Sequence, residues 1–105
     1  MDQALNTFKP GLLTSAEFNP GSSMVWAAGQ LFEAAAQAAH LGDNPTPAQV
    51  LDGLYDLKSE TLGGLTAPLT FTKGKPTSLK CWFYYQVKDG KFTNPFGVSP
   101  ACASS

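Results

Sequence analysis

Arginine is absent from this 105-residue sequence, and histidine occurs only once. Eight acidic residues slightly outnumber the seven lysines, so the net charge is −1 and no basic patch for a phosphate backbone is present. No apolar run approaches the roughly 20 residues that a membrane-spanning helix needs. We therefore expect neither a nucleic-acid partner nor a spanning segment. A secretory signal is also missing, so an exported protein would carry its signal upstream of Met1.

Residues that form catalytic or metal sites are equally scarce. His40 has no serine or cysteine arranged with it as a nucleophile–base pair, and only this imidazole could join Cys81 and Cys102 as a metal ligand. Gly63-Gly64 lacks the lysine and hydroxyl of a phosphate-binding loop, which favours a tight bend with close backbone approach. We expect no enzyme, no cofactor and no metal site.

The proportion of charged residues is low. At 14% charged and 43% hydrophobic the sequence is typical of a globular chain, but an independent soluble domain carries about 25% charged residues. The length allows one domain with one modest core, or a piece of a larger domain. The deficit of charge favours the second interpretation, in which part of the surface is buried against further protein.

Two cysteines, Cys81 and Cys102, leave two alternatives open. A disulfide would hold the C-terminal tail and stabilise the fold by about 3 kcal/mol in the chain-entropy model. The other possibility is one buried and one exposed thiol in a reducing compartment. The disulfide is favoured, because an exposed free cysteine near a terminus is reactive.

Two helices are predicted in the first part of the chain. Residues Ser22–His40 are rich in alanine, with Ser22 or Ser23 as the N-terminal cap and Gly42 at the left-handed C-terminal position. Thr46-Pro47-Ala48-Gln49 predicts a capping box that opens a second helix ending near Leu57, with Gly53 as a weak point. The expected core face of the first helix recurs at steps of three and four: Val25, Ala28, Gly29, Phe32, Ala35, Ala36 and Ala39.

The second part of the chain predicts strands. We expect a short strand over Leu69–Thr72, a long alternating strand over Leu79–Val87, and an Asp89-Gly90 turn into Lys91–Thr93. Both faces of the long strand carry aromatic groups, which predicts a wedge between two packed layers rather than a stacking surface. Its aromatic residues are Trp82, Phe83, Tyr84 and Tyr85.

The expected fold class is therefore α/β, with two helices followed by a β-hairpin and short strands. We divide the single partial domain, 1–105, into a connecting segment 1–21, a helical part 22–58, a β-rich part 60–94 and a tail 95–105. Short apolar clusters before Pro10-Gly11 suggest one brief helical turn. Exposed sheet edges and apolar faces predict self-association or strand exchange.

The start of the long helix has two interpretations, and one of them is a ligand site. Ser22, Ser23 and Met24 lie where free N–H groups and the helix dipole favour a carboxylate or another anion. The alternative on local chemistry is an ordinary serine cap.

Four motifs follow one another between Val25 and Phe92. They are Val25–Gly29, Thr46–Val50, Thr61–Phe71 and Tyr84–Phe92. In this order they resemble the C-terminal end of a type I periplasmic binding protein of the branched-chain amino acid group, the substrate-binding component of an ABC importer.

The resemblance implies a function for the intact protein and a role for this part. Such proteins close two α/β lobes around an amino acid or similar molecule outside the cytoplasm and deliver it to a membrane permease. The residue before the "VW" of the long helix lines the cleft in that family, which makes Met24, with Ser23 beside it, the expected ligand residue. The chain would hold only the last part of the fold and would bind weakly or not at all alone.

Two other functions stay open. A ligand-sensing domain of a receptor or regulator can share the same fold, and its sequence context, an output domain or a membrane helix, would distinguish it. A free-standing interaction module without a small ligand is the second alternative.

Overall fold

The computed structural model describes residues 1–19, 21–76 and 78–103, so the connecting segment 1–21 and the tail 95–105 each include residues outside this description. Both helices and short strands are present in the described part. In chain order the elements are α1 (Asp2–Phe8), the 3₁₀-helix η1 (Leu12–Thr14), α2 (Gly21–Ala38), α3 (Pro47–Asp56), β1 (Cys81–Trp82), β2 (Gln86–Lys88), β3 (Lys91–Thr93) and β4 (Ala101–Cys102).

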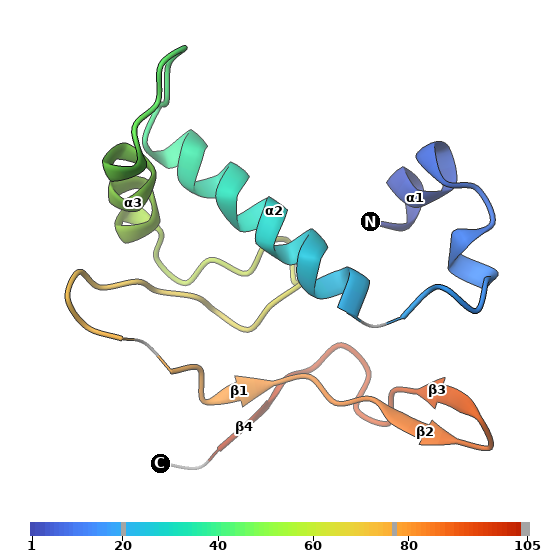
Figure 1. Ribbon diagram of the computed structural model, residues 1–105. Coiled ribbons are helices and arrows are strands. Elements are labelled where there is room, and N and C mark those ends of the chain that lie inside the picture. Colours follow the sequence, from blue (N-terminus) through green and yellow to red (C-terminus); the bar gives the residue numbers. More distant parts are fainter. Residues whose placement is uncertain (20, 77, 104–105) are drawn as a thin grey trace.

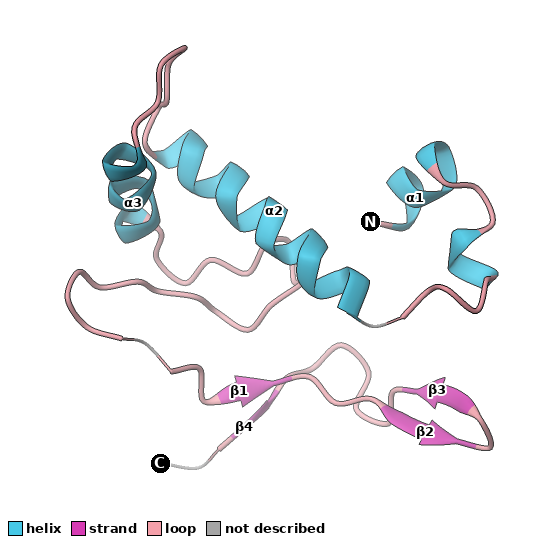
Figure 2. Ribbon diagram, in the orientation of Figure 1, coloured by secondary structure: helices cyan, strands magenta, loops and turns pink. Residues whose placement is uncertain are grey.

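Helices and strands occupy separate regions (Figures 1 and 2). The long helix α2 packs against α3 near its C-terminal end, while α1 and η1 lie near its other end. The strands form two antiparallel pairs, β1 with β4 and β2 with β3, in an extended segment. This mixture of helices and small antiparallel sheets is compatible with the α/β class expected from the sequence.

The start of α3 confirms the capping box. The Thr46 hydroxyl accepts a hydrogen bond from the Gln49 backbone N–H at 3.4 Å, and the Gln49 side-chain oxygen accepts one from the Thr46 N–H at 2.9 Å. Pro47 occupies the first turn, where its missing N–H costs nothing. Two donors that the helix leaves without a partner are thus satisfied locally.

The ends of α2 differ from the prediction. The helix begins at Gly21, so Ser22 and Ser23 lie inside its first turn and neither holds the cap position. At the other end His40, not Gly42, adopts the left-handed conformation, with φ +49°. The His40 N–H donates to the Gln37 carbonyl and the Leu41 N–H to the Ala36 carbonyl, both at 3.1 Å, which is the Schellman pattern.

A glycine at position 40 should therefore stabilise the chain. Because a left-handed φ strains any residue with a Cβ, we expect His40→Gly to raise the free energy of unfolding by about 1 kcal/mol. Gly42→Ala is the matched control, because Gly42 has no positive φ and a Cβ there meets nothing within 4 Å. Urea unfolding of both variants checks this. Destabilisation by His40→Gly would contradict the strain argument.

The expected core face of α2 is only half covered. Ala35 is fully buried against α3, but Val25 and Phe32 are 76% and 59% exposed. Ala28 and Gly29 are exposed as well. The predicted burial of the N-terminal half of this face is therefore wrong: α3 is ten residues long and reaches only the C-terminal half.

Gly53 lies at the centre of the α2–α3 contact. It is buried, and a Cβ built on it would meet the Ala35 carbonyl oxygen at 2.1 Å and the Ala39 Cβ at 2.9 Å. The residue expected to be a weak point is thus the one that lets the two helix backbones approach closely. Tertiary packing overrides helix propensity at this position.

A bend at 60–67 completes the small core. Leu62 and Ala67 are buried, and the run Leu62-Gly63-Gly64 has φ values of +52°, +68° and +88°. Both glycines are thus needed for their positive φ. The expected close approach is not found, because a Cβ on either glycine meets nothing within 4 Å.

The strand expected over Leu69–Thr72 is absent. Two isolated bridges take its place, one between Glu60 and Leu69 and one between Thr72 and Lys75. The chain crosses this region as an irregular connection below α2 (Figure 1).

The segment 79–103, called the arm below, replaces the expected long strand. Only Cys81–Trp82 and Gln86–Lys88 form strands, so the prediction of one strand over Leu79–Val87 is wrong. The hairpin is confirmed: Lys88 pairs with Lys91, and Asp89 and Gly90 between them have φ +51° and +72°. Positive φ at both loop residues is typical of the hairpin turn that matches strand twist.

Candidate functional site

A groove of about 380 Å³ lies between α1 and the N-terminal half of α2. Its α2 residues recur at steps of three and four, so they form one side of that helix. Leu5 of α1 and Met1, the N-cap residue before it, line the opposite side. The lining residues are Met1, Leu5, Ser22, Val25, Trp26, Gly29, Gln30 and Glu33.

The groove is mainly apolar, with Ser22 at one end of its α2 side and Gln30 and Glu33 at the other. Leu5, Val25 and Trp26 provide hydrocarbon and indole surface, which suits an aliphatic or aromatic group. The Glu33 carboxylate, which accepts a hydrogen bond from the Gln37 amide at 3.3 Å, is the one charged side chain among the lining residues. This arrangement can hold an apolar body with an ammonium group near the carboxylate.

The two predicted ligand residues lie outside the groove. Met24 is 75% exposed on α2, and Ser23 is partly buried in the same turn. Neither is among the residues that line the groove, whereas their neighbours Ser22 and Val25 are. At about 100° per residue, Ser23 lies at the edge of the groove, whereas Met24 lies on the opposite side of α2. The predicted ligand residues are therefore not brought together in this cavity.

The anion site considered at the start of α2 has fewer free donors than expected. The Asn19 side-chain oxygen accepts from the Gly21 N–H at 2.9 Å, and the Asn19 carbonyl accepts from the Ser22 N–H at 3.0 Å. Because these two first-turn donors have partners, the geometry favours the apolar groove over the helix N-terminus as the candidate site.

Sequence reasoning missed most of the groove. Val25 and Gly29 were assigned to a core face, and Met1, Leu5 and Glu33 were given no role. A usable signal existed on α2, where Ser22, Gly29 and Glu33 lie on one side of the helix and mix polar with small residues. Nothing in the local pattern placed α1 against that side.

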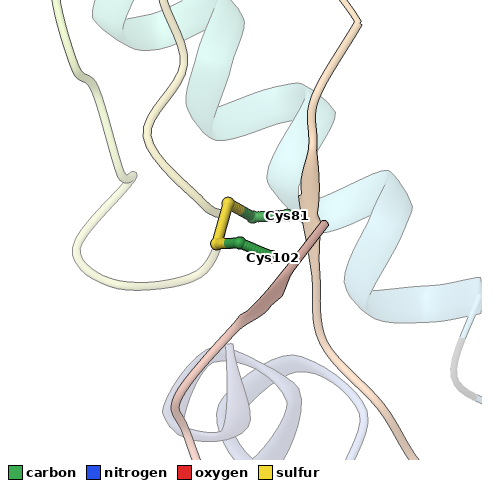
Figure 3. The surroundings of a disulfide bond; sticks show 2 residues. All are labelled: Cys81 and Cys102. Atoms are coloured by element: carbon green, nitrogen blue, oxygen red, sulfur yellow. A yellow bond between two sulfur atoms is a disulfide. The ribbon is translucent and has the colours of Figure 1, made fainter. Parts of the chain in front are cut away.

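The arm is closed by a disulfide between Cys81 and Cys102, which is the pairing favoured from the sequence (Figure 3). The two residues are direct partners in the β1–β4 pair, with Cα atoms 3.9 Å apart. The Lys80 carbonyl accepts from the Ala103 N–H at 2.8 Å, so the cysteines occupy a non-hydrogen-bonded pair, where facing side chains come closest.

Aromatic rings of the arm contact one another and stay exposed. Tyr84 packs against Trp82 and Phe96 with ring centroids 6.0 and 5.4 Å apart, and Tyr85 packs edge-on against Phe92 at 5.5 Å. No strand of the arm contacts a helix within the described elements. The expected wedge between two packed layers is therefore not found.

Other chemistry has no geometric support in residues 1–19, 21–76 and 78–103. No three His, Cys, Asp or Glu side chains there gather as a metal site. His40 is exposed at the end of α2. None of the helices in the same residues is both long and apolar enough to cross a bilayer.

Comparisons with known proteins supply no relative. No family model matches the chain, and searches of curated proteins and of solved structures found no match either.

Proposed function

We propose that this chain belongs to an extracytoplasmic solute-binding protein that delivers an amino acid, or a similar small molecule, to an ABC importer. The ligand-contacting part in this chain is the groove between α1 and α2. In the intact protein a second lobe closes over the ligand, and contacts made only in the closed state select that state. No bond is made or broken in this function.

The shape and polarity of the groove carry the proposal. An aliphatic amino acid has an apolar side chain that fits against Leu5, Val25 and Trp26, and an ammonium group that fits near Glu33. The volume of about 380 Å³ suits a small ligand and lies near the lower limit for small-molecule sites. The order of motifs in the sequence supports the same protein class.

The small core also supports the proposal of a larger parent. Apart from Gly53, the buried residues are Ala35, Leu62 and Ala67, and none of the described large side chains is fully buried. The radius of gyration is 16.4 Å, compared with about 13 Å for an independent domain of this length. Both observations agree with a part that is completed by further protein.

Titration with amino acids, followed by NMR, tests the site. Leucine, isoleucine and valine are expected to shift the Trp26 indole N–H signal with an affinity in the millimolar range, because one half of a cleft makes only some of the contacts. Trp82 lies in the arm and provides an internal reference. Lysine and aspartate should shift Trp26 less, because their charged side chains do not fit an apolar groove.

Two variants distinguish binding in the groove from nonspecific binding of amino acids to the surface. Glu33→Gln removes the charge that faces the ammonium group and should weaken leucine binding about tenfold. Asp52→Asn, on the exposed side of α3, is the matched control and should leave the titration unchanged. Equal shifts at Trp26 and Trp82, or no effect of Glu33→Gln, would argue against this assignment.

The exposed apolar surface favours a second candidate, an interaction module without a small ligand. Within residues 1–19, 21–76 and 78–103, fourteen large hydrophobic side chains are exposed, and large exposed apolar patches mark interaction surfaces. If no amino acid shifts Trp26, this second function becomes the better explanation.

A further inference from the structure

The hairpin of β2 and β3 has one face that is apolar. Val87 pairs with Phe92, and residues directly opposite each other in an antiparallel pair lie on the same face. The Tyr85 ring packs edge-on against Phe92 with ring centroids 5.5 Å apart, so it joins that face. We define the apolar face as Tyr85, Val87 and Phe92, which are 63%, 60% and 61% exposed. All three side chains are thus largely open to solvent.

The other face of the hairpin is cationic. Side chains alternate along a strand, so Lys88 and its cross-strand partner Lys91 lie on the face opposite Val87 and Phe92. Both lysines are exposed. Two like charges directly opposite each other destabilise a strand pair, and an anion close to both would relieve that repulsion. The hairpin is therefore amphipathic, with aromatic and aliphatic groups on one side and two ammonium groups on the other.

The arm as a whole is both aromatic and basic. It holds six of the twelve aromatic residues of the chain, and all six are exposed. Three lysines and one acidic residue, Asp89, give the arm a charge of +2, which leaves −3 for the rest of a chain of net charge −1. Positive charge is thus concentrated in the segment that also exposes its aromatic rings.

We propose that the hairpin binds the surface of an anionic lipid bilayer, with the apolar face in the interface and the two lysines beside the lipid phosphates. Aromatic rings with polar tips favour this level of a bilayer, and lysines are attracted to acidic headgroups. Amphipathic helices bind there through the same division into an apolar and a lysine-bearing face. Because the phosphates lie on the water side of the hydrocarbon, a bilayer contacts both faces of the hairpin at once. A protein that covered the apolar face would leave the lysines in water, and a nucleic acid would meet the lysines alone.

The position of the hairpin permits this binding. It lies at the end of the arm away from β1 and β4 (Figure 1), and no strand of the arm contacts a helix within the described elements. The hairpin can therefore lie on a bilayer without moving α2 or α3. The charge of −3 on the rest of the chain disfavours an orientation in which another side faces the acidic lipid. Vesicle binding is independent of the proposed amino-acid site, because that groove lies between α1 and α2.

Sedimentation of the full chain with lipid vesicles tests the cationic face. We expect binding to vesicles of phosphatidylglycerol and phosphatidylcholine in equal parts, and at least about thirtyfold weaker binding to pure phosphatidylcholine. Lys88→Gln combined with Lys91→Gln should weaken binding to the acidic vesicles about thirtyfold, because each lysine near such a surface contributes about fivefold. Lys73→Gln combined with Lys75→Gln is the matched control. It removes the same charge from an exposed turn outside the arm and should change binding less than about twofold.

A second substitution tests the apolar face. Phe92→Thr removes the ring but introduces a residue type that strands favour, and it should weaken binding to the acidic vesicles about tenfold. Phe8→Thr, the same substitution at a side chain 82% exposed in α1, is the control and should have no effect. Cross-strand NOEs between positions 87 and 92 verify that the hairpin is still formed. If Phe92→Thr loses them, the lysine variants decide, because they leave the apolar face intact.

Three results would overturn the proposal. The first is a wild type that does not bind the acidic vesicles, which would leave the apolar face to a protein partner. The second is a pair of lysine variants in the hairpin that bind as tightly as the wild type. The third is an equal loss of binding in the hairpin variants and in their matched controls.

Discussion

Gly53→Ala is expected to lower the free energy of unfolding by about 2 kcal/mol or more, although alanine is the better helix former. The added methyl group would lie 2.1 Å from the Ala35 carbonyl oxygen and 2.9 Å from the Ala35 carbonyl carbon. Because both are backbone atoms, no rotamer change relieves the clash, and α3 must move away from α2. That contact is the principal helix packing in the chain, so its loss opens the core.

Gly29→Ala is the matched control for this prediction. Gly29 also lies inside a helix, but a Cβ there meets nothing within 4 Å. Its replacement should therefore stabilise the chain by up to about 1 kcal/mol through helix propensity. Urea unfolding followed by circular dichroism at a helical wavelength gives both values. If the two variants shift stability in the same direction, the close approach at Gly53 is not a determinant of the fold.

The contrast between these two glycines shows which features of the fold can be predicted from the sequence. Local signals predicted local structure well: the Thr46–Gln49 capping box and the Asp89-Gly90 hairpin are confirmed, and α2 and α3 begin and end within two residues of the expected positions. Each depends on hydrogen bonds between residues close in the chain. The low helix propensity of Gly53 led to the prediction of a weak point. That prediction was wrong because the role of Gly53 depends on a partner helix, which no local pattern specifies.

The remaining errors have the same physical origin. Alternation predicted a continuous strand through Phe83 and Tyr85, but a strand needs a neighbour, and β4 pairs only with the two residues at Cys81–Trp82. The periodicity of α2 correctly identified an apolar face without showing that α3 covers only half of it. The groove depends on α1, whose position beside α2 is not encoded in either helix alone.

The arm has almost no buried residues, so its stability must come from something other than a core. Residues 82–100 are all exposed, and two-residue strands have too few hydrogen bonds to be stable alone. The Cys81–Cys102 disulfide is therefore the main interaction that keeps this segment folded. Replacing both cysteines by serine should lower the free energy of unfolding of the arm by about 3 kcal/mol. This is the loop-closure value for a separation of 21 residues.

This loss should be confined to the arm. Because no strand contacts a helix in the described elements, the α2–α3 unfolding midpoint of the double variant should match that of the wild type, while the near-ultraviolet signal of the Trp82, Tyr84 and Phe96 rings should decrease. Reduced wild-type protein is the control and should behave like the variant. An equal fall in the helical midpoint would mean that the arm packs on the helices. A variant with intact ring signals would mean that the aromatic contacts, and not the disulfide, hold the arm together.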